Sequence, residues 1–282
     1  MSYFNYNGKL CREGLPVIGP DNRGLRYGDG LFETMKMIQG KLVFGDEHFA
    51  RLWNGLKLLQ FELPRHFTPE MLHQQILSLA EKNGHTNSAR IRLQIIRGDG
   101  GLYDAKNHIP GYIIQTWLLP EEQGEWNSNG LVIGTYDTVK KSCDVTSNFK
   151  HNNFLPYVLA ALEAKSRKWD DAVLLNNYSR ICDTTIANIF MVKDQVISTP
   201  PLTEGCVAGI IRKAIIKGLP EKSWQIVEQE LTLDQLFTAD ELFLTNSLYN
   251  IRWVQRLGKA SYRNEVTKKI FIAFKPLFDG DV

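Results

Sequence analysis

A polar, acidic stretch rich in turn-forming residues divides this chain into two differently patterned parts. It runs from Pro120 to Gly130 and follows a region of short strand-like segments joined by tight turns. Beyond it, strand-like and helix-like segments alternate. We therefore predict a mixed α/β (α+β) fold of two domains, a smaller one over residues 1–119 and a larger one over 131–282, with residues 120–130 as a linker. The length of 282 residues agrees with this division.

Charge and cysteine usage exclude several classes of protein. Lys plus Arg number 33 and Asp plus Glu 31, and this balance argues against a general nucleic-acid or membrane-surface binder. The four cysteines are scattered, without a paired spacing or a histidine that would complete a metal site, so we expect no metal and a reducing interior. The first residues lack a signal-peptide pattern and no apolar run approaches about 20 residues, which indicates a soluble, cytoplasmic protein without membrane contact.

Local signals place several elements. Asn7-Gly8 and Gln39-Gly40 lie between strand-like segments and predict two hairpins. Thr68 and Pro69 are typical of a helix start, as N-cap and first helical residue. In the second part, a loop containing Gly205 leads into a helix that we expect over residues 207–217.

Two segments carry residues that periodicity alone does not explain. Gly28-Asp29-Gly30 predicts a tight turn or a close approach of the backbone to another group. Lys150 lies among small polar and aromatic residues directly before an apolar helix. It is either a solvated charge or a desolvated lysine suited to Schiff-base chemistry.

Two further segments are weak signals when taken singly. Asp183 precedes two threonines and a strand, and its side chain would ordinarily close a turn. The loop from Pro200 to Arg212 enters a helix, and helix N-termini bind anions through free backbone N–H groups.

In this order and spacing, the four segments resemble the class IV aminotransferases, fold-type IV enzymes that use pyridoxal 5′-phosphate. This family includes branched-chain aminotransferases, D-amino-acid aminotransferases and 4-amino-4-deoxychorismate lyases. The resemblance extends from the Asn7-Gly8 hairpin to about Val254. It implies a two-domain fold like that of D-amino-acid aminotransferase, with the cofactor in the larger C-terminal domain, and a homodimer with shared active sites.

The resemblance assigns the central chemistry to two residues. Lys150 matches the lysine that forms the internal aldimine and moves the proton at the substrate's α-carbon. Asp183 matches the acid that keeps the pyridine nitrogen protonated, so that the ring withdraws electrons. The family usually has glutamate there. The shorter aspartate implies either a ring that lies nearer the strand or a water molecule that bridges the gap.

The phosphate of the cofactor is expected to meet several donors. Arg51 matches the family's phosphate arginine, and Ile210 and Ile211 match a turn whose backbone N–H groups hold phosphate oxygens. Ser247 matches a hydroxyl residue on the other side of the phosphate. Without the resemblance, Arg51 would be interpreted as a solvated charge on a helix.

Substrate contacts are expected from arginines. Arg92 resembles an arginine near the substrate of branched-chain enzymes, and Arg97 resembles the carboxylate arginine of D-amino-acid enzymes. Arg26 and Tyr27 lie on the turn that, in the family, reaches the partner subunit's active site. Strand alternation places Arg92 on the same face as Arg90, and Arg97 on the other face unless the strand ends first. As surface or structural charges, these arginines would have no part in substrate binding.

The sequence therefore predicts an aminotransferase that moves an amino group between an amino acid and a 2-oxo acid. The alternative is a 4-amino-4-deoxychorismate lyase, which releases 4-aminobenzoate and pyruvate for folate synthesis. The segment from Arg97 to Tyr103 resembles the lyases, but Leu102-Tyr103 replaces an arginine that some lyases have there. A non-catalytic scaffold that binds the cofactor is a remote alternative, since it would be expected to have lost Lys150.

Overall fold

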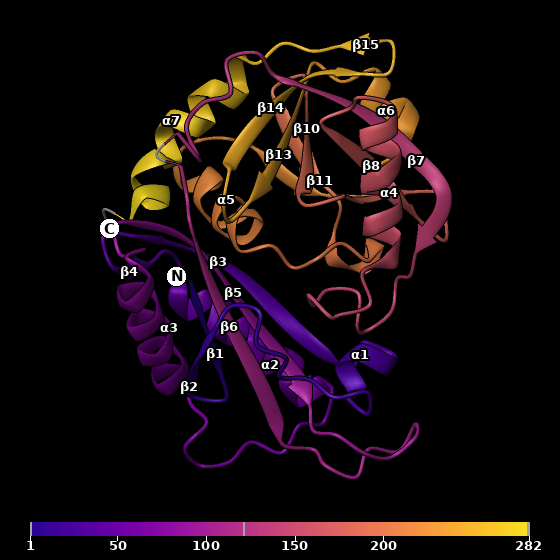
Figure 1. Cartoon of the computed structure of the whole chain (residues 1–282). Coiled ribbons are helices and arrows are strands. Elements are labelled where there is room, and N and C mark those ends of the chain that lie inside the picture. The colour runs from indigo at the N-terminus through magenta and orange to yellow at the C-terminus, as the bar shows by residue number, and fades with distance from the viewer. Residues whose placement is uncertain (1, 121, 281–282) are drawn as a thin grey trace. The chain divides into compact units, whose positions relative to one another are not determined.

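The computed structural model describes residues 2–120 and 122–280, so Met1, Glu121 of the predicted linker and the last two residues lie outside it. The chain packs into two compact units (Figure 1). Unit 1 consists of Met1–Gln123 and Phe149–Asn153, and unit 2 consists of Gly124–Asn148 and Phe154–Val282. Helices and strands are mixed in both, which confirms the predicted fold class. The domain limits at residues 119 and 131 remain a prediction. That prediction treats each domain as one continuous stretch of sequence, so it does not assign Phe149–Asn153 to the first domain.

Unit 1 is built on a six-stranded sheet in which every neighbouring pair is antiparallel. In the order of the sheet, its strands are β2 (Lys9–Arg12), β1 (Tyr3–Tyr6), β6 (Pro110–Leu118), β5 (Ser88–Arg97), β3 (Gly30–Ile38) and β4 (Lys41–Leu42). Its helices are α1 (Arg23–Tyr27), α2 (Gly45–Leu58) and α3 (Pro69–Asn83).

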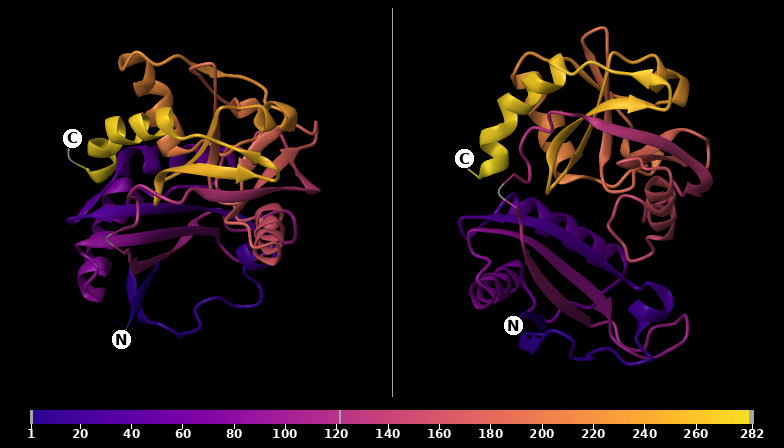
Figure 2. Two further views of the ribbon diagram at one scale, coloured as in Figure 1. Left: turned by 90° about the horizontal axis from the view of Figure 1, so that it is seen from above. Right: turned by 45° about the horizontal axis from the view of Figure 1, so that its top comes forward.

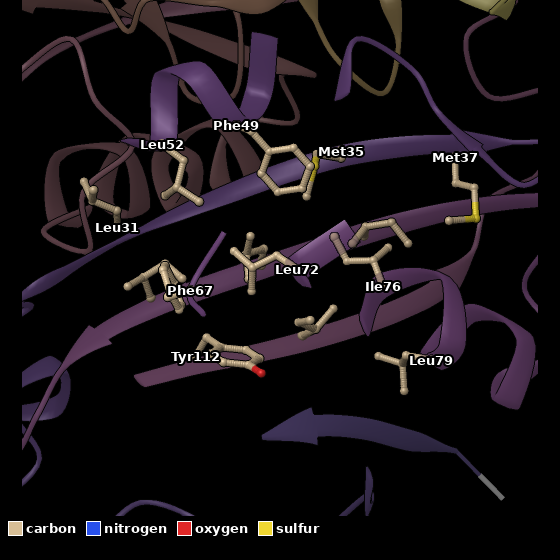
Figure 3. Close-up of a cluster of buried hydrophobic side chains, with 14 of the residues drawn as sticks. Leu31, Met35, Met37, Phe49, Leu52, Phe67, Leu72, Ile76, Leu79 and Tyr112 are labelled. Atoms are coloured by element: carbon tan, nitrogen blue, oxygen red, sulfur yellow. The ribbon is translucent and has the colours of Figure 1, made fainter. Parts of the chain in front are cut away.

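The core of unit 1 forms where α2 and α3 contribute apolar side chains to one face of this sheet. Figure 3 shows ten of these buried side chains: Leu31, Met35, Met37, Phe49, Leu52, Phe67, Leu72, Ile76, Leu79 and Tyr112. Along β5, Ile91, Leu93 and Ile95 are fully buried and alternate with polar residues. Burial of each such side chain contributes about 1.5 to 3 kcal/mol. The alternation confirms that Arg90 and Arg92 share the face opposite the core.

The local signals in unit 1 predicted its turns correctly. Asn7 and Gly8 have φ values of 50° and 86°, and Gln39 and Gly40 have values of 48° and 75°. A two-residue turn with both positions left-handed matches the right-handed twist of the strands that it joins. Helix α3 begins as expected, because the Thr68 side chain accepts a hydrogen bond from the backbone N–H of Met71.

Unit 2 contains a nine-stranded mixed sheet. Its main path runs through β12 (Ile226–Glu228), β11 (Val196–Thr199), β10 (Asn188–Lys193), β13 (Glu241–Asn246), β14 (Asn250–Leu257), β7 (Leu131–Lys141), β8 (Asp171–Asn176) and β9 (Ile181–Thr184). The short strand β15 (Ala260–Ser261) pairs with β14. The helices are α4 (Leu155–Ser166), the 3-10 helix η1 (Leu202–Glu204), α5 (Ile210–Glu221), α6 (Leu233–Phe237) and α7 (Glu265–Asp279).

Helices cover the sheet of unit 2. The buried face of α4 packs against β8 and β9, while α7 runs beside β13 and β14 (Figure 2). Helix α5 starts at Ile210, so the predicted start at residue 207 is wrong. The backbone N–H groups of Val207 and Ala208 donate instead to Asp183 and to the carbonyl of Asn148, which holds them in a loop.

In the part of the chain that the structure describes, no helix has both the length and the apolar character needed to cross a membrane.

Candidate active site

The segment that contains Lys150 is held as an added strand at the edge of β3 in unit 1. The backbone N–H of Phe32 donates to the carbonyl of Lys150 at 2.8 Å, and the N–H of Asn152 donates to the carbonyl of Gly30 at 3.0 Å. Between them, Leu31 and His151 form an antiparallel bridge. Lys150 therefore has a backbone fixed by sheet hydrogen bonds, although its segment lies far from β3 in the sequence.

The two glycines of the Gly28-Asp29-Gly30 turn are required by this packing. A Cβ atom on Gly30 would lie 2.1 Å from the carbonyl oxygen of Ile95, and one on Gly28 would lie 2.4 Å from Oδ1 of Asn153. Gly28 also has a left-handed φ of 64°. The expected close approach is thus confirmed: Gly30 lies against the backbone of β5, and Gly28 lies against the segment that contains Lys150.

Lys150 and Arg92 both lie against the ring of Phe32. Nζ of Lys150 is 4.8 Å from the ring centroid, and Cζ of Arg92 is 3.9 Å from it. Both cation–ring contacts are of the attractive kind. Burial lowers the pKa of Arg92, and the positive charge of Arg90 adds to this effect. A carboxylate that approached Arg92 would offset both the lost hydration and the repulsion between the two arginines.

Arg97 lies on the core side of β5 and is surrounded by protein groups. Its guanidinium donates to both oxygens of Asp29, at 3.0 and 2.9 Å, and to the backbone carbonyls of Leu59 and Gln60. It also contacts Nδ1 of His108 at 3.2 Å. These contacts favour a structural role, in which Arg97 holds the turn at Asp29, over the substrate contact expected from the sequence.

Arg26 and Tyr27 lie in helix α1, at the surface of unit 1. Arg26 is exposed and pairs with Asp21 at 2.5 Å. Tyr27 is half-buried, with its ring centroid 5.9 Å from that of Tyr103 and 5.0 Å from Cζ of Arg23. Both side chains make these contacts within unit 1.

Arg51 lies on α2 and forms a buried cluster with two residues that the sequence had not indicated. Its Nε and Nη2 atoms donate to the two oxygens of Glu33, at 2.8 and 2.5 Å. Nδ1 of His48 lies 2.7 Å from Oε2 of the same carboxylate. The spacing of His48 and Arg51 places them on one helix face, which is a signal that could have linked them.

The charges of this cluster follow from burial and pairing. Burial raises the pKa of Glu33, but the charge of Arg51 and the hydrogen bond from His48 outweigh it and lower the pKa to about 2. Burial lowers the pKa of His48 more than Glu33 raises it, which favours the neutral ring. Glu33 is therefore an anion that a bidentate arginine neutralises.

In unit 2, Asp183 lies on β9 and does not close a local turn, so that interpretation of the sequence is wrong. Oδ2 accepts hydrogen bonds from Nζ of Lys141 at 3.0 Å, the hydroxyl of Tyr157 at 2.9 Å and the backbone N–H of Val207 at 2.9 Å. Oδ1 accepts one from Nδ2 of Asn188 at 2.9 Å. Sequence reasoning missed Lys141 and Tyr157, which lie on β7 and α4.

The groups around Asp183 are neutral, with the exception of Lys141. Burial and the negative charge of Asp183 raise the pKa of Tyr157 well above 10. Burial raises the pKa of the Cys182 and Cys206 thiols, and the value for Cys206 is about 12. A phenol and two thiols at physiological pH therefore surround a carboxylate paired with one ammonium group.

Unit 2 also offers donors for an anion at the start of α5. The first-turn N–H groups of Ile210 and Ile211 have no carbonyl of the preceding turn to bond. The N-cap is Gly209, where a Cβ atom would lie 1.9 Å from Oδ1 of Asn188. Thr245 is paired with Asn188 across the sheet, and within the described residues its buried hydroxyl lacks a hydrogen-bond partner. Ser247 follows in the loop between β13 and β14.

These features fit pyridoxal 5′-phosphate. An unpartnered buried hydroxyl and a glycine-lined start of a helix suit a phosphorylated polar ligand. Asp183 on the same unit provides a carboxylate for a ring nitrogen. In unit 1, Lys150 provides an amine beside an aromatic ring.

The comparisons with known proteins agree with this chemistry. The model of the family Amino-transferase class IV matches residues 30–257. A putative branched-chain-amino-acid aminotransferase of Methanocaldococcus jannaschii is 33% identical over 96% of this chain and 94% of its own length. An aminodeoxychorismate lyase of Vibrio harveyi is 31% identical over 82% of this chain and 83% of its own length. The Escherichia coli branched-chain amino acid aminotransferase is similar in structure, with a TM-score of 0.87, 26% identity, and coverage of 100% of this chain and 95% of that one.

The fold and the residues described above define a fold-type IV enzyme. This chain belongs to the class IV aminotransferase family, whose members depend on pyridoxal 5′-phosphate. The resemblance drawn from the four sequence segments is thereby confirmed at the level of the family.

Proposed function

We propose that this protein is a pyridoxal-phosphate-dependent aminotransferase that moves an amino group between an amino acid and a 2-oxo acid. The observation that supports it most is the joint contact of Lys150 and Arg92 with the ring of Phe32. Through this contact, the Phe32 ring lies beside both the amine of Lys150 and the guanidinium of Arg92, and the guanidinium is suited to bind a carboxylate. An α-amino acid presents its acidic α-carbon directly beside such a carboxylate.

The residues have separate tasks in this proposal. When bound, the cofactor supplies an electron-withdrawing ring that acidifies the α-carbon of the amino acid. Lys150 would hold the cofactor through Nζ, and the same amine would move the proton at the α-carbon of the substrate. Asp183 would hold the ring nitrogen of the cofactor through its carboxylate. Its fixed position on β9 orients the ring before substrate arrives.

The phosphate is assigned to donors from both parts of the sequence. Arg51 supplies charge, Ile210 and Ile211 supply backbone N–H groups, and Ser247 supplies a hydroxyl. We add the hydroxyl of Thr245 to this set, because it is buried and lacks a partner among the described residues. Polar groups of this kind need a ligand or water to satisfy them.

Arg92 is assigned to the substrate carboxylate. Arg26 and Tyr27 are assigned to the active site of a second copy, since the resemblance implies a homodimer with shared sites. Arg97 is assigned to the turn at Asp29, which carries α1 toward β3. A cytoplasmic location stays a prediction.

The test of the covalent site is the Lys150→Ala variant. Borohydride reduction of the wild-type protein with pyridoxal 5′-phosphate should label the peptide that contains Lys150, as mass spectrometry reads it. The variant should lose this label, and its turnover should fall by about a thousandfold or more, because the proton carrier and the covalent anchor are both removed. The variant Lys140→Ala, which removes a lysine of β7, should keep both. A label that persists in Lys150→Ala would refute the assignment.

A second candidate is 4-amino-4-deoxychorismate lyase. It is favoured by the 31% identity to the Vibrio harveyi lyase and by the proximity of Arg90 to Arg92, which suits a substrate with two carboxylates. Incubation with aminodeoxychorismate alone should distinguish the two. Pyruvate and 4-aminobenzoate formed without an amino acceptor would establish the lyase. Glutamate formed only when amino acid and 2-oxoglutarate are both supplied would establish the aminotransferase.

A further inference from the structure

Lys141 is a buried lysine without a role predicted from the sequence. Its residue is 4% exposed, at the end of β7. Nζ lies 3.0 Å from Oδ2 of Asp183 and 3.3 Å from the carbonyl oxygen of Ser147. It also lies 5.0 Å from the centroid of the Tyr157 ring. A lysine is rarely buried unless it is paired, so its retention beside Asp183 points to an electrostatic task.

The hydrogen bonds of Asp183 leave one of its two oxygens available. A carboxylate accepts about four hydrogen bonds, about two at each oxygen. Among the described residues, Oδ2 accepts hydrogen bonds from three donors and Oδ1 from one, Asn188. The remaining acceptor position of Asp183 therefore lies at Oδ1, on the side away from Lys141.

The charges that face Asp183 come from several elements. Tyr157 on α4, Cys182 on β9 and Cys206 in the loop before α5 are neutral because their pKa values are raised. Arg212 on α5 is paired with Glu228. Among the described residues, Lys141 is then the one cation within hydrogen-bond distance of the Asp183 carboxylate. The negative charge of Asp183 is thus already paired with the positive charge of Lys141 before any ligand binds.

We propose that Lys141 is a positioning residue that fixes Asp183 as an anion through Oδ2 and, by sharing its charge, weakens the hold of Oδ1 on the ring-nitrogen proton of bound pyridoxal 5′-phosphate. The inference rests on the proposed function, because it assigns Asp183 to the ring nitrogen. Physically, a carboxylate beside an ammonium group attracts a second cation less than an unpaired carboxylate does. The Lys141–Asp183 ion pair makes this site different from one in which the acid interacts with no cation other than the ring nitrogen.

The test compares two ligands that differ only at the ring nitrogen. The unloaded protein is titrated with pyridoxal 5′-phosphate and with 1-deazapyridoxal 5′-phosphate, in which a C–H group replaces the nitrogen. The ratio of the two dissociation constants isolates the contact with Asp183. The wild type should prefer the natural cofactor by less than about tenfold, and Lys141→Gln should increase that preference by about tenfold.

Two control variants separate charge from packing. Lys141→Arg keeps the charge and should keep the wild-type ratio. Lys140→Gln removes the adjacent positive charge, and it should also leave the ratio unchanged. A ratio in Lys141→Gln equal to that of the wild type would overturn the inference. So would a wild-type preference above about a hundredfold, which can be measured even if Lys141→Gln does not fold.

The outcomes also separate this inference from the proposed function. A wild-type protein that binds neither ligand would refute the pyridoxal-phosphate function, and the role of Lys141 with it. A wild type that binds both ligands while Lys141→Gln shows no change in their ratio would refute only the role of Lys141. To measure the ring proton directly, the ¹⁵N NMR signal of ring-labelled cofactor should lose its proton at a lower pH in the wild type than in Lys141→Gln.

Discussion

In unit 1, Glu33 receives both of its charged hydrogen bonds from one residue, Arg51. In unit 2, Asp183 accepts hydrogen bonds from four donors, which lie on β7, α4, β10 and the loop before α5. Both carboxylates are 2% exposed, so neither is neutralised by bulk water. The first acid depends on a single cation. The second keeps three neutral donors if its cation is removed. Two equally buried acids should therefore respond very differently to the loss of one partner.

The largest effect is expected from Arg51→Met in the unloaded protein. It leaves Glu33 buried without its cation, and breaking such a pair costs about 3 to 5 kcal/mol. Lys141→Met removes one donor of four, and we expect a smaller loss of about 1 to 3 kcal/mol. Urea denaturation measures both losses of stability. Hydrogen exchange of α2 reports on unit 1, and that of β7 reports on unit 2. Equal losses would remove the distinction between the two acids.

A double variant tests the reason for the first loss. Arg51→Met with Glu33→Gln removes the charge along with its partner, so most of the lost stability should return. If the double variant is as unstable as Arg51→Met alone, the loss comes from packing of the arginine stem, and the ion pair is not its cause.

The next effect concerns pH. Because the pKa of Glu33 falls from 4.5 to about 2 on folding, its contribution is fully present above about pH 4.5 and is lost as the pH falls toward 2. The shift corresponds to about 3 kcal/mol. Glu33→Gln should remove this acid dependence, as measured by denaturation at a series of pH values. A wild-type slope that persists in Glu33→Gln would contradict the assignment.

The stability of unit 2 should depend on pH in the alkaline range. The pKa of Tyr157 is raised on folding, so its contribution is present below pH 10 and is lost as the pH rises above that value. Tyr157→Phe should remove this alkaline dependence and leave the acid dependence of unit 1 unchanged.

The smallest effect is expected from Asp183→Glu, which introduces the acid that is usual in the family. The carboxylate of Asp183 is enclosed by Lys141, Tyr157, Asn188 and Val207, so an added methylene overpacks the site at a cost of about 1 to 3 kcal/mol. Thermal denaturation of the unloaded protein measures this cost. An unchanged melting temperature would show that the surrounding side chains make room for the longer acid.

The sequence predicted those features that depend on neighbours along the chain. Alternation placed Arg90 and Arg92 on one face of β5 and Arg97 on the other, and the turn-forming dipeptides predicted the two hairpins. The glycines around Asp29 indicated a close approach. The family was recognised from the order and spacing of four motifs, and this recognition did not require knowledge of the contacts that the motif residues make.

The partners of the key charges could not be predicted in this way. Lys141 meets Asp183 only because β7 and β9 both flank β8, an order of strands that the sequence pattern does not reveal. A pair of lysines at 140 and 141 is typical of a solvated surface. Nothing in the sequence joined Glu33 to Arg51. Ion pairs between segments that are distant in sequence depend on the order of the strands in the sheet, and the hydrophobic periodicity of the sequence does not predict that order.

The return of Phe149–Asn153 to unit 1 has a consequence for synthesis of the chain. When Gln123 leaves the ribosome, the edge of β3 at Gly30–Phe32 still lacks the strand that completes it. Domains that are contiguous can fold as soon as they emerge. Here the first unit must wait for the 25 residues Gly124–Asn148 of the second unit, and for Phe149–Asn153, before its last hydrogen bonds form. Lys150 is therefore among the last residues to be fixed in it.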